Sequence, residues 1–597
     1  MTRNLILLAA AILSGLQPAS AQIYRVTIDR NLRVPMRDGI KLAADVYFPA
    51  EVERAPVILM RTPYKKEASQ NLGIYYGQHG YAAVVEDVRG RFSSEGRWEP
   101  FVNEAKDGYD TIEWLARQRW SNGKVGMIGG SYLAWVQWFA ASLHPPHLTT
   151  IIPNASPSDP FHNMPYDNGM LFLTGTFLWT SVVESGATSS LTDTRLRTAV
   201  HKRFGSLMRA LPVVDLDKAV LGKESRFWRD WIAHPSPRDP YWSGTLFLES
   251  LKKLKIPVFH QSGWFDGDGI GTELNYLKMT SYGHANQKLT IGPWPHSDSA
   301  TRGIWGHDFG PQALIDLQGE YLRWFDYWLK GVDNGILREP LVSVFAMGSN
   351  HWLRAAKYPL PETRTEKLYL TSGGHANTSR GDGKLSFTAP TDSEPPDRYV
   401  YDPGDPTPDP SFYEPSEADE TAARPQEELM KDAEAVRAQV TQSRQDILVY
   451  TTEPFAAPYT MVGPVSAVIY ASSSARDTDW FVHLVEVDES GKFLPLIGAD
   501  SGKVRARFRS SLNKTQFLKP GAIYKYTIDL WQTGITIRPG HRLRIELASA
   551  DFPTYSRNLN TGGNNETETK FVSAEQAVYH DAKHPSYLLL PRIPERP

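Results

Sequence analysis

The chain has 597 residues, of which 41% are hydrophobic and 22% charged, and this composition argues against disordered, collagen-like and coiled-coil proteins. At roughly 150 residues per domain, the length predicts about four folding units, or fewer if some are large. The 64 basic and 67 acidic residues leave a formal charge of −3, which creates no field that would attract nucleic acid, so no nucleic-acid partner is expected.

The sequence contains no cysteine. Disulfides, a thiol nucleophile and thiolate metal ligands are therefore excluded together, and any nucleophile must be an oxygen or a nitrogen. The pairs His144 with His147 and His296 with His307 lack the helical spacing and the nearby carboxylates of a metal site. We expect neither a metal nor a cofactor.

The first 21 residues have the pattern of a secretory signal peptide. Arg3 precedes an apolar run from Leu5 to Leu16, and small residues end the segment at Ala21. Cleavage after Ala21 would release a secreted or periplasmic protein. No later segment approaches about 18 uninterrupted apolar residues, so no membrane span is expected.

Residues 22–157 alternate short apolar runs with a helical pattern, as in a mostly parallel sheet with crossover helices. The predicted strands include Pro56–Met60, Tyr81–Val85 and Val125–Ile128, and the predicted helix covers Glu104–Arg117. Residues 247–349 repeat this texture. They contain the predicted strands Ile256–His260 and Leu289–Gly292 and a helix over Tyr321–Leu329.

Residues 158–246, between these two blocks, are rich in helical patterns and aromatic side chains. Because strands flank this stretch on both sides, we expect a helical cap inserted into one α/β domain.

Residues 350–597 show short alternating runs between turns rich in Pro, Gly, Asp and Ser, which predicts an all-β jelly-roll domain. Its predicted strands are Val465–Ala471, Trp480–Val487, Tyr524–Leu530 and Arg542–Leu547. The charged stretch Glu414–Arg444 is expected to be a surface connection, in part helical.

Ser131 follows an apolar strand and two glycines, and an apolar helix follows it. A serine at such a strand-to-helix turn is the geometry of a nucleophile elbow, with the helix N-terminus facing any oxyanion formed there. The simple Gly-x-Ser-x-Gly pattern is not met, because Leu133 occupies its last position and the small residue Ala134 comes one later. By itself the string also fits a Gly-rich turn with a capping serine.

Asp266 and His296 each come just after the carboxyl end of a predicted strand, where open α/β sheets gather their catalytic groups. The chain order Ser131, Asp266, His296 is that of the α/β-hydrolases. Alone, either residue could be a turn former, but three such residues at three strand ends predict a Ser-His-Asp triad.

Three strings carry a family resemblance: Gly-Gly-Ser-Tyr-Leu-Ala at 129–134, Gly-Trp-Phe-Asp-Gly at 263–267 and Gly-Pro-Trp-Pro-His-Ser at 292–297. They resemble the cocaine esterase and Xaa-Pro dipeptidyl-peptidase class of serine hydrolases (CocE/NonD family), which includes α-amino-acid ester hydrolases and glutaryl-cephalosporin acylases. The resemblance covers nearly the whole mature chain. It implies an α/β-hydrolase domain, an inserted helical cap and a C-terminal jelly roll.

The resemblance also implies residue roles. Ser131 would be the nucleophile, His296 the general base and then acid, and Asp266 the group that holds the imidazole in its productive tautomer. Tyr64, with the backbone N–H of Tyr132, would form the oxyanion hole. Tyr64 could instead be a packed tyrosine.

Within this family, the α-amino-acid ester hydrolases bind a substrate ammonium through carboxylates, one of them two residues after the triad aspartate. Here that position is Asp268, the next, acidic in those enzymes, is Gly269, and Asp167 is a candidate partner in the cap. The cluster is therefore incomplete. Asp268 and Asp167 could also be ordinary structural aspartates held by backbone amides.

Three hypotheses remain for this chain. It could hydrolyse esters or amides of small acyl groups, α-amino-acid esters among them. It could be an Xaa-Pro dipeptidyl-peptidase acting on short peptides. Finally, it could be a non-catalytic protein whose jelly roll binds a saccharide or peptide. The oligomeric state is left open, and a homo-oligomer is compatible with the sequence.

Overall fold

The computed structural model describes residues 23–184, 207–297, 299–304, 306–409, 426–497 and 501–594. The predicted signal peptide, residues 1–21, lies outside these ranges. Within them, no helix is both long and apolar enough to cross a bilayer.

A ten-stranded sheet forms the core of the hydrolase domain. Its strands from β4 to β13 run parallel, while β1, β2 and β14 are antiparallel to their neighbours. In spatial order the strands are β1 (Val26–Pro35), β2 (Lys41–Pro49), β4 (Ala82–Asp87), β3 (Ala55–Thr62), β5 (Ser121–Gly130), β6 (Leu148–Asn154), β9 (Val258–Phe265), β10 (Gln287–Pro295), β13 (Val342–Ala346) and β14 (His351–Ala355).

Helices cover both faces of this sheet, which explains why strands such as β3 are buried along their whole length. Val57 and Leu59 pack in the cluster that contains α2 (Glu104–Ala116) and α3 (Tyr132–Ser142). Ile58 and Met60 point the other way, toward α1 (Gln70–Gln78), α10 (Leu317–Phe325) and the following turn η6 (Asp326–Lys330). Shorter elements of this domain are η1 (Lys66–Ser69), the hairpin β11 (Gly303–Ile304) and β12 (His307–Asp308), η5 (Pro311–Ala313) and η7 (Ile336–Arg338), and α9 (Gly269–Ser281) follows β9.

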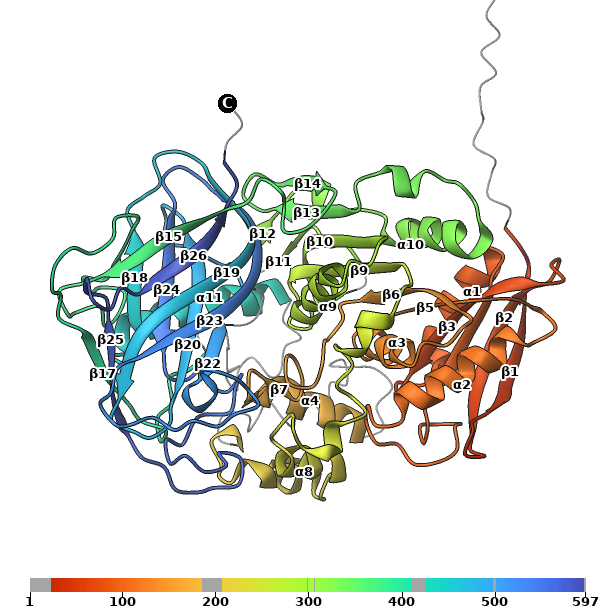
Figure 1. The fold of residues 1–597 in the computed structure, drawn as a ribbon, viewed down its shortest axis with the longest axis horizontal. Coiled ribbons are helices and arrows are strands. Elements are labelled where there is room, and N and C mark those ends of the chain that lie inside the picture. The colour runs from red at the N-terminus through yellow and green to blue at the C-terminus, as the bar shows by residue number, and fades with distance from the viewer. Residues whose placement is uncertain are drawn as a thin grey trace, which may run out of the picture.

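The described part of the chain between β6 and β9 forms the cap, which lies between the two larger domains at the lower side of Figure 1. Phe177, Trp228 and Trp231 of the cap belong to the same buried cluster as the α2 and α3 face of the sheet. The described elements are β7 (Tyr166–Asp167), β8 (Met170–Leu171), α4 (Leu173–Glu184), η2 (Val213–Asp215), α7 (Leu216–Leu221), α8 (Arg226–Ala233), η3 (Pro240–Trp242) and η4 (Ser250–Lys253).

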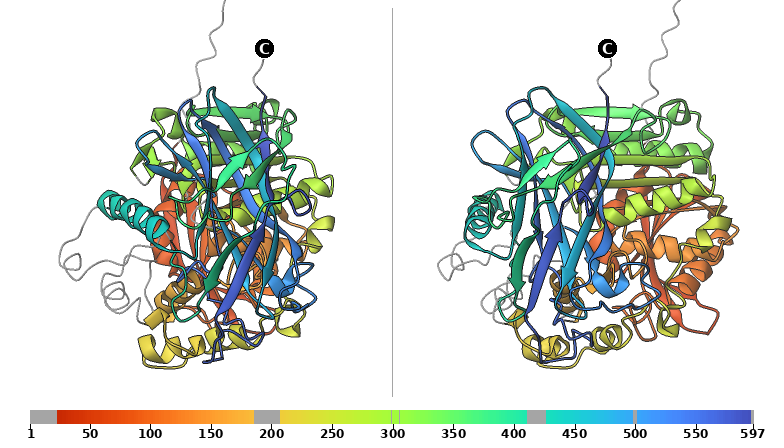
Figure 2. Two further views of the ribbon diagram at one scale, coloured as in Figure 1. Left: turned by 90° about the vertical axis from the view of Figure 1, so that its left-hand side faces the viewer. Right: turned by 60° about the vertical axis from the view of Figure 1, so that its left-hand side comes forward.

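The C-terminal part is an all-β domain, as predicted. Its main path runs β17-β25-β19-β26-β15-β16-β18-β24-β20-β21, with β22 beside β20 and β23 beside β19. Bounds are β15 (Arg364–Thr371), β16 (Lys384–Ser386), β17 (Asp397–Tyr401), β18 (Leu448–Thr452), β19 (Tyr459–Ser473), β20 (Asp479–Val487), β21 (Phe493–Pro495), β22 (Gly502–Arg505), η8 (Ala506–Phe508), β23 (Tyr524–Ile537), β24 (Arg542–Ala548), β25 (Ala574–Tyr579) and β26 (Tyr587–Arg592). The helix α11 (Gln426–Ser443) lies on the outside of this domain (Figure 2).

The predicted boundary between the hydrolase and β domains, at residue 350, is too early. Strand β14 begins at His351 and pairs antiparallel with β13, so it closes the edge of the hydrolase sheet. The first strand of the β domain is β15, which begins at Arg364. A short antiparallel strand has the same alternating texture in either sheet, and its sequence does not reveal which neighbour it joins.

Candidate active site

Ser131 occupies the sharp turn between β5 and α3, with φ 59° and ψ −123°. Its backbone N–H donates to the carbonyl of Asn154 at the end of β6, which fixes the turn to the sheet. The turn requires glycine at 129, where φ is +146° and a Cβ would lie 2.5 Å from Cβ of Leu133. This is the strained turn that presents a serine hydroxyl above the carboxyl edge of a parallel sheet.

Asp266 and His296 follow the neighbouring parallel strands β9 and β10. His296 Nδ1 lies 2.7 Å from Asp266 Oδ1, and the Asp266 side chain is fully buried whereas that of His296 is 47% exposed. Ser262 Oγ donates to the other Asp266 oxygen, at 2.5 Å. Because Nδ1 faces a buried carboxylate, it carries the proton, and Nε2 is left to accept one.

Asp268 lies beside both the serine and the imidazole. Its Oδ2 is 3.3 Å from Ser131 Oγ, which donates to it, and 3.8 Å from His296 Nε2. Burial, together with the charge of Asp266, raises the pKa of Asp268 to about 6, although His296 and Ser131 act in the opposite direction. The structure therefore brings four of the predicted residues, Ser131, Asp266, Asp268 and His296, to one edge of the sheet.

The two predicted oxyanion-hole residues also meet near this edge. Tyr132 is the first residue of α3, where a backbone N–H has no acceptor within the helix. The ring of Tyr64, which follows β3, lies edge-on to the ring of Tyr132 with centroids 6.4 Å apart. Burial raises the pKa of Tyr64 to about 12, so the phenol is protonated at neutral pH.

Trp179 of the cap helix α4 contacts the phenol of Tyr64, a contact that sequence reasoning missed. Its Nε1–H donates to Tyr64 Oη at 2.8 Å. Since this bond uses a lone pair of the phenol oxygen, the phenol hydrogen remains available for an acceptor in the site. The aromatic pattern of the cap gave no signal that one tryptophan reaches the predicted oxyanion hole.

Asp167, the candidate partner in the cap, is bonded to side chains of the β domain. It is 2% exposed, Lys503 Nζ of β22 lies 2.5 Å from its carboxylate, and Tyr555 Oη donates to it at 3.2 Å. Because Lys503 already neutralises this charge, we do not retain Asp167 as a substrate-binding residue. Its partners lie more than 300 residues away in the β domain, and the pair joins that domain to the cap.

Comparisons with known proteins show the family of the chain. Residues 38–298 match the family model described as X-Pro dipeptidyl-peptidase (S15 family), and residues 334–589 match that of the X-Pro dipeptidyl-peptidase C-terminal non-catalytic domain. The chain is 32% identical over 588 residues to the cocaine esterase of Rhodococcus sp. (strain MB1 Bresler), covering 95% of this chain and 99% of that protein. The chain belongs to the CocE/NonD family of serine hydrolases.

Two solved structures share the whole architecture. An α-amino acid ester hydrolase superposes with a TM-score of 0.78 at 26% identity, and an aminopeptidase from a marine sediment archaeon (Thaumarchaeota archaeon) with 0.78 at 25% identity. Each comparison covers 98% of this chain and 99% of the other. The hydrolase domain, the cap and the β domain are therefore found together in related enzymes.

Gly269, next to Asp268 in this CocE/NonD hydrolase, is packed tightly against Asp266, the predicted triad aspartate. A Cβ at this position would lie 2.6 Å from Ser262 Oγ and 3.0 Å from Asp266 Cβ. The site thus has space for the carboxylate of Asp268 but not for a second side chain directly after it. Within the described ranges, no group of three or more His, Asp or Glu side chains is placed to hold a metal ion.

Proposed function

We propose that this serine hydrolase acts on esters or amides of small acyl groups through an acyl-enzyme formed on Ser131. His296 Nε2 takes the Ser131 proton as the hydroxyl oxygen bonds to the acyl carbon, and then gives that proton to the departing alcohol or amine. Water repeats the sequence and releases the acid. The observation that carries the proposal is the placement of the His296 imidazole. Its Nδ1 is hydrogen-bonded to Asp266, and its Nε2 lies beside Asp268 Oδ2, the oxygen that also accepts from Ser131 Oγ.

Charge that develops on the carbonyl oxygen needs donors that are already in place. We assign this role to the Tyr64 phenol and to the backbone N–H of Tyr132. Trp179 supports the assignment, because its bond to Tyr64 Oη leaves the phenol as a donor.

For the substrate class, we propose esters that carry a free α-amino group. The supporting feature is Asp268, a carboxylate at the nucleophile whose only side-chain hydrogen bond found among the described residues is the 3.3 Å contact from Ser131. A substrate ammonium would supply the donors that this carboxylate lacks. The solved α-amino acid ester hydrolase of the same architecture points the same way.

An Xaa-Pro dipeptidyl-peptidase is the second candidate, and the two matching family models favour it. Such a substrate also carries a free ammonium, so Asp268 fits both candidates. The non-catalytic binding protein considered from the sequence is not retained, since the chain belongs to a family of serine hydrolases.

The first test labels the mature protein with a serine-directed phosphonate and assays wild type and Ser131→Ala on an amino-acid ester, a simple aryl ester and an Xaa-Pro amide. We expect wild type to be labelled and Ser131→Ala to lose both labelling and turnover, the latter by about 10⁴-fold or more. A labelled Ser131→Ala variant would refute the assignment of the nucleophile. Preference among the three substrates decides between esterase and peptidase.

The second test addresses the ammonium. Asp268→Asn is expected to lower kcat/KM for the amino-acid ester by about 10- to 100-fold, the worth of a hydrogen bond between charged groups, with a smaller effect on the aryl ester. Asp333→Asn, which changes an exposed aspartate paired with Arg338, is the matched control. Equal losses on both esters in Asp268→Asn would contradict ammonium binding.

We also propose that the protein is exported. The supporting pattern is the N-terminal segment that ends at Ala21. N-terminal sequencing of the protein from the periplasm or the medium should begin at Gln22, and an intact Met1 on mature protein would contradict export by this signal.

A further inference from the structure

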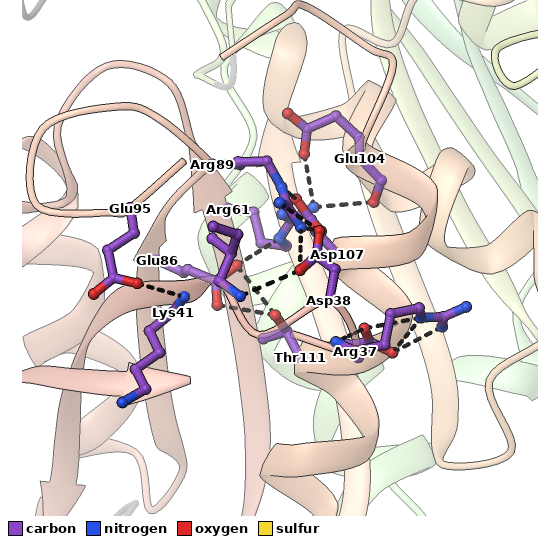
Figure 3. A network of polar contacts seen from close by, with 12 residues as sticks. Arg37, Asp38, Lys41, Arg61, Glu86, Arg89, Glu95, Glu104, Asp107 and Thr111 are labelled. Carbon is purple, nitrogen blue, oxygen red and sulfur yellow. Dashed lines mark hydrogen bonds and ion pairs between the residues drawn. The ribbon is translucent and has the colours of Figure 1, made fainter. Parts of the chain in front are cut away.

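A buried polar network starts at the side chain of Tyr132. The phenol of Tyr132 donates to Glu104 Oε1 at 2.8 Å, and the second oxygen of Glu104 accepts from Arg61 Nη1, also at 2.8 Å. Glu104 is the first residue of α2 and is 2% exposed, while Arg61 lies in β3 and is fully buried. Figure 3 shows dashed lines that join Arg61 of β3 to Glu104 at the start of α2.

Arg61 is fixed by a second carboxylate. Its Nε donates to Glu86 Oε1 of β4 at 2.7 Å, and Thr111 Oγ1 of α2 donates to the other Glu86 oxygen at 2.9 Å (Figure 3). Two strands and one helix are thus tied together through one guanidinium. Charged groups bonded in this way inside a protein hold each other rigidly, because releasing any one leaves a buried charge without a partner.

The network leads to both donors of the oxyanion hole. Glu104 binds the phenol of Tyr132, and the backbone N–H of the same tyrosine is one of the two donors. The network holds β3 by Arg61, three residues before Tyr64, the other donor. We propose that the Arg61–Glu104 pair is a positioning device that sets the geometry of the oxyanion hole; this rests on the proposed function, in which Tyr64 and Tyr132 stabilise the oxyanion.

The physical reason is the steep dependence of catalysis on donor placement. An oxyanion hole acts only when its donors lie about 2.7–3.1 Å from the developing charge, and a displacement of about 1 Å can cost 10²-fold in rate. A Tyr132 side chain without its acceptor would let the first turn of α3 shift. Because Arg61 and Glu104 are buried, we treat them as positioning residues that act through the two tyrosines.

The test is Tyr132→Phe, which removes one hydroxyl and keeps the ring. We expect kcat for p-nitrophenyl acetate to fall about tenfold with KM changed less than twofold, because only the transition state uses the donor. Tyr64→Phe, which deletes a donor outright, is the benchmark at about 10²- to 10³-fold.

Tyr81→Phe is the matched control. Tyr81 is also fully buried and donates to a carboxylate, Asp326 Oδ1, at 2.7 Å, but it precedes β4 and lies at the opposite edge of the sheet from the site. Its loss should lower the thermal midpoint by an amount similar to Tyr132→Phe and leave kcat unchanged. A merely structural role for Tyr132 would give the two variants the same kinetics.

A second pair of variants changes the acceptor. Glu104→Gln keeps an oxygen for Tyr132, whereas Glu104→Ala removes it, so we expect Gln to retain most of the kcat that Ala loses. If Glu104→Ala does not fold, Tyr132→Phe and Tyr81→Phe still decide. A Tyr132→Phe kcat within twofold of wild type, or an equal loss in Tyr81→Phe, would overturn this inference alone. Wild type that neither turns over ester nor reacts with the phosphonate would overturn the proposed function as well.

Discussion

The chain holds two carboxylates in opposite surroundings, one fully buried in the β domain and one partly exposed beside Ser131, the proposed nucleophile. In the β domain, Asp397 is fully buried and accepts from Ser372 Oγ at 2.7 Å, Tyr450 Oη at 2.6 Å and the Ala376 backbone N–H at 2.7 Å. Nε2 of the buried His580 lies 2.9 Å away. Burial alone would raise the pKa of Asp397, but these donors hold it below its usual range.

Asp268 in the active site shows the reverse balance. Ser131 Oγ at 3.3 Å is a long donor, His296 Nε2 is 3.8 Å away, and burial keeps the pKa raised to about 6. The comparison teaches how to tell a structural carboxylate from one that can bind a ligand. A structural carboxylate comes with its own donors, whereas one that is short of donors can take them from a ligand.

The largest expected effect comes from Asp266. It is fully buried and both of its oxygens are hydrogen-bonded, as in Asp397, yet one of its partners is His296, the proposed catalytic base. Asp266→Asn should lower kcat by about 10⁴-fold, because an amide no longer holds the productive tautomer of His296. Steady-state kinetics on the preferred ester measures this. A loss below tenfold with normal folding would place Asp266 among the structural acids.

A smaller effect is expected from the titration of Asp268. Because its carboxylate becomes neutral as the pH falls through about 6, the attraction for a substrate ammonium is present above that pH and is lost below it. Between pH 7 and pH 5, kcat/KM for an amino-acid ester relative to a neutral ester should fall about tenfold. The ratio cancels the titration of the shared catalytic groups.

Asp268→Asn supplies the reference for that profile. In this variant the ratio should stay flat over the same pH interval. A flat ratio in wild type would mean that Asp268 does not face the bound ammonium, and the contrast with Asp397 would then carry no functional meaning.

The smallest effect on activity is expected from His580, whose two ring nitrogens face Asp397 and Glu394. Although burial lowers the pKa of His580, these carboxylates raise it overall. Its stabilising contribution is therefore complete below the ordinary pKa of about 6.5 and is lost as the pH rises through the raised value. His580→Gln should cost about 2 kcal/mol of stability in mild acid and leave kcat/KM unchanged.

Thermal unfolding followed by circular dichroism at several pH values checks this. The gap between wild type and His580→Gln should narrow toward alkaline pH. A gap that widens with pH, or an equal loss of esterase activity per folded molecule, would show that the β-domain network is not purely structural.

Much of this architecture could be predicted from local patterns. The fold class is confirmed by the family and structural comparisons, and Asp266 and His296 could be singled out because each directly follows an apolar strand of a parallel sheet. In such a sheet the carboxyl ends of neighbouring strands meet, so sequence position translates into spatial proximity.

Contacts between distant segments could not be predicted in this way. Glu104 looks in the sequence like an acid that favours a helix N-terminus, and only the packing of α2 turns it toward Tyr132. Asp167 has the type of residue expected for an ammonium site, but its charge is neutralised by Lys503, 336 residues further along the chain. Such long-range neighbours decide whether the charge of an acidic side chain remains available for a ligand.

The close packing around Gly269 has a consequence for anyone who wishes to redesign selectivity. An acidic residue in place of Gly269 would bring its Cβ to 2.6 Å from the hydroxyl oxygen of Ser262, which itself donates a hydrogen bond to Asp266. Any stronger binding of a substrate ammonium would therefore come with a displaced Asp266.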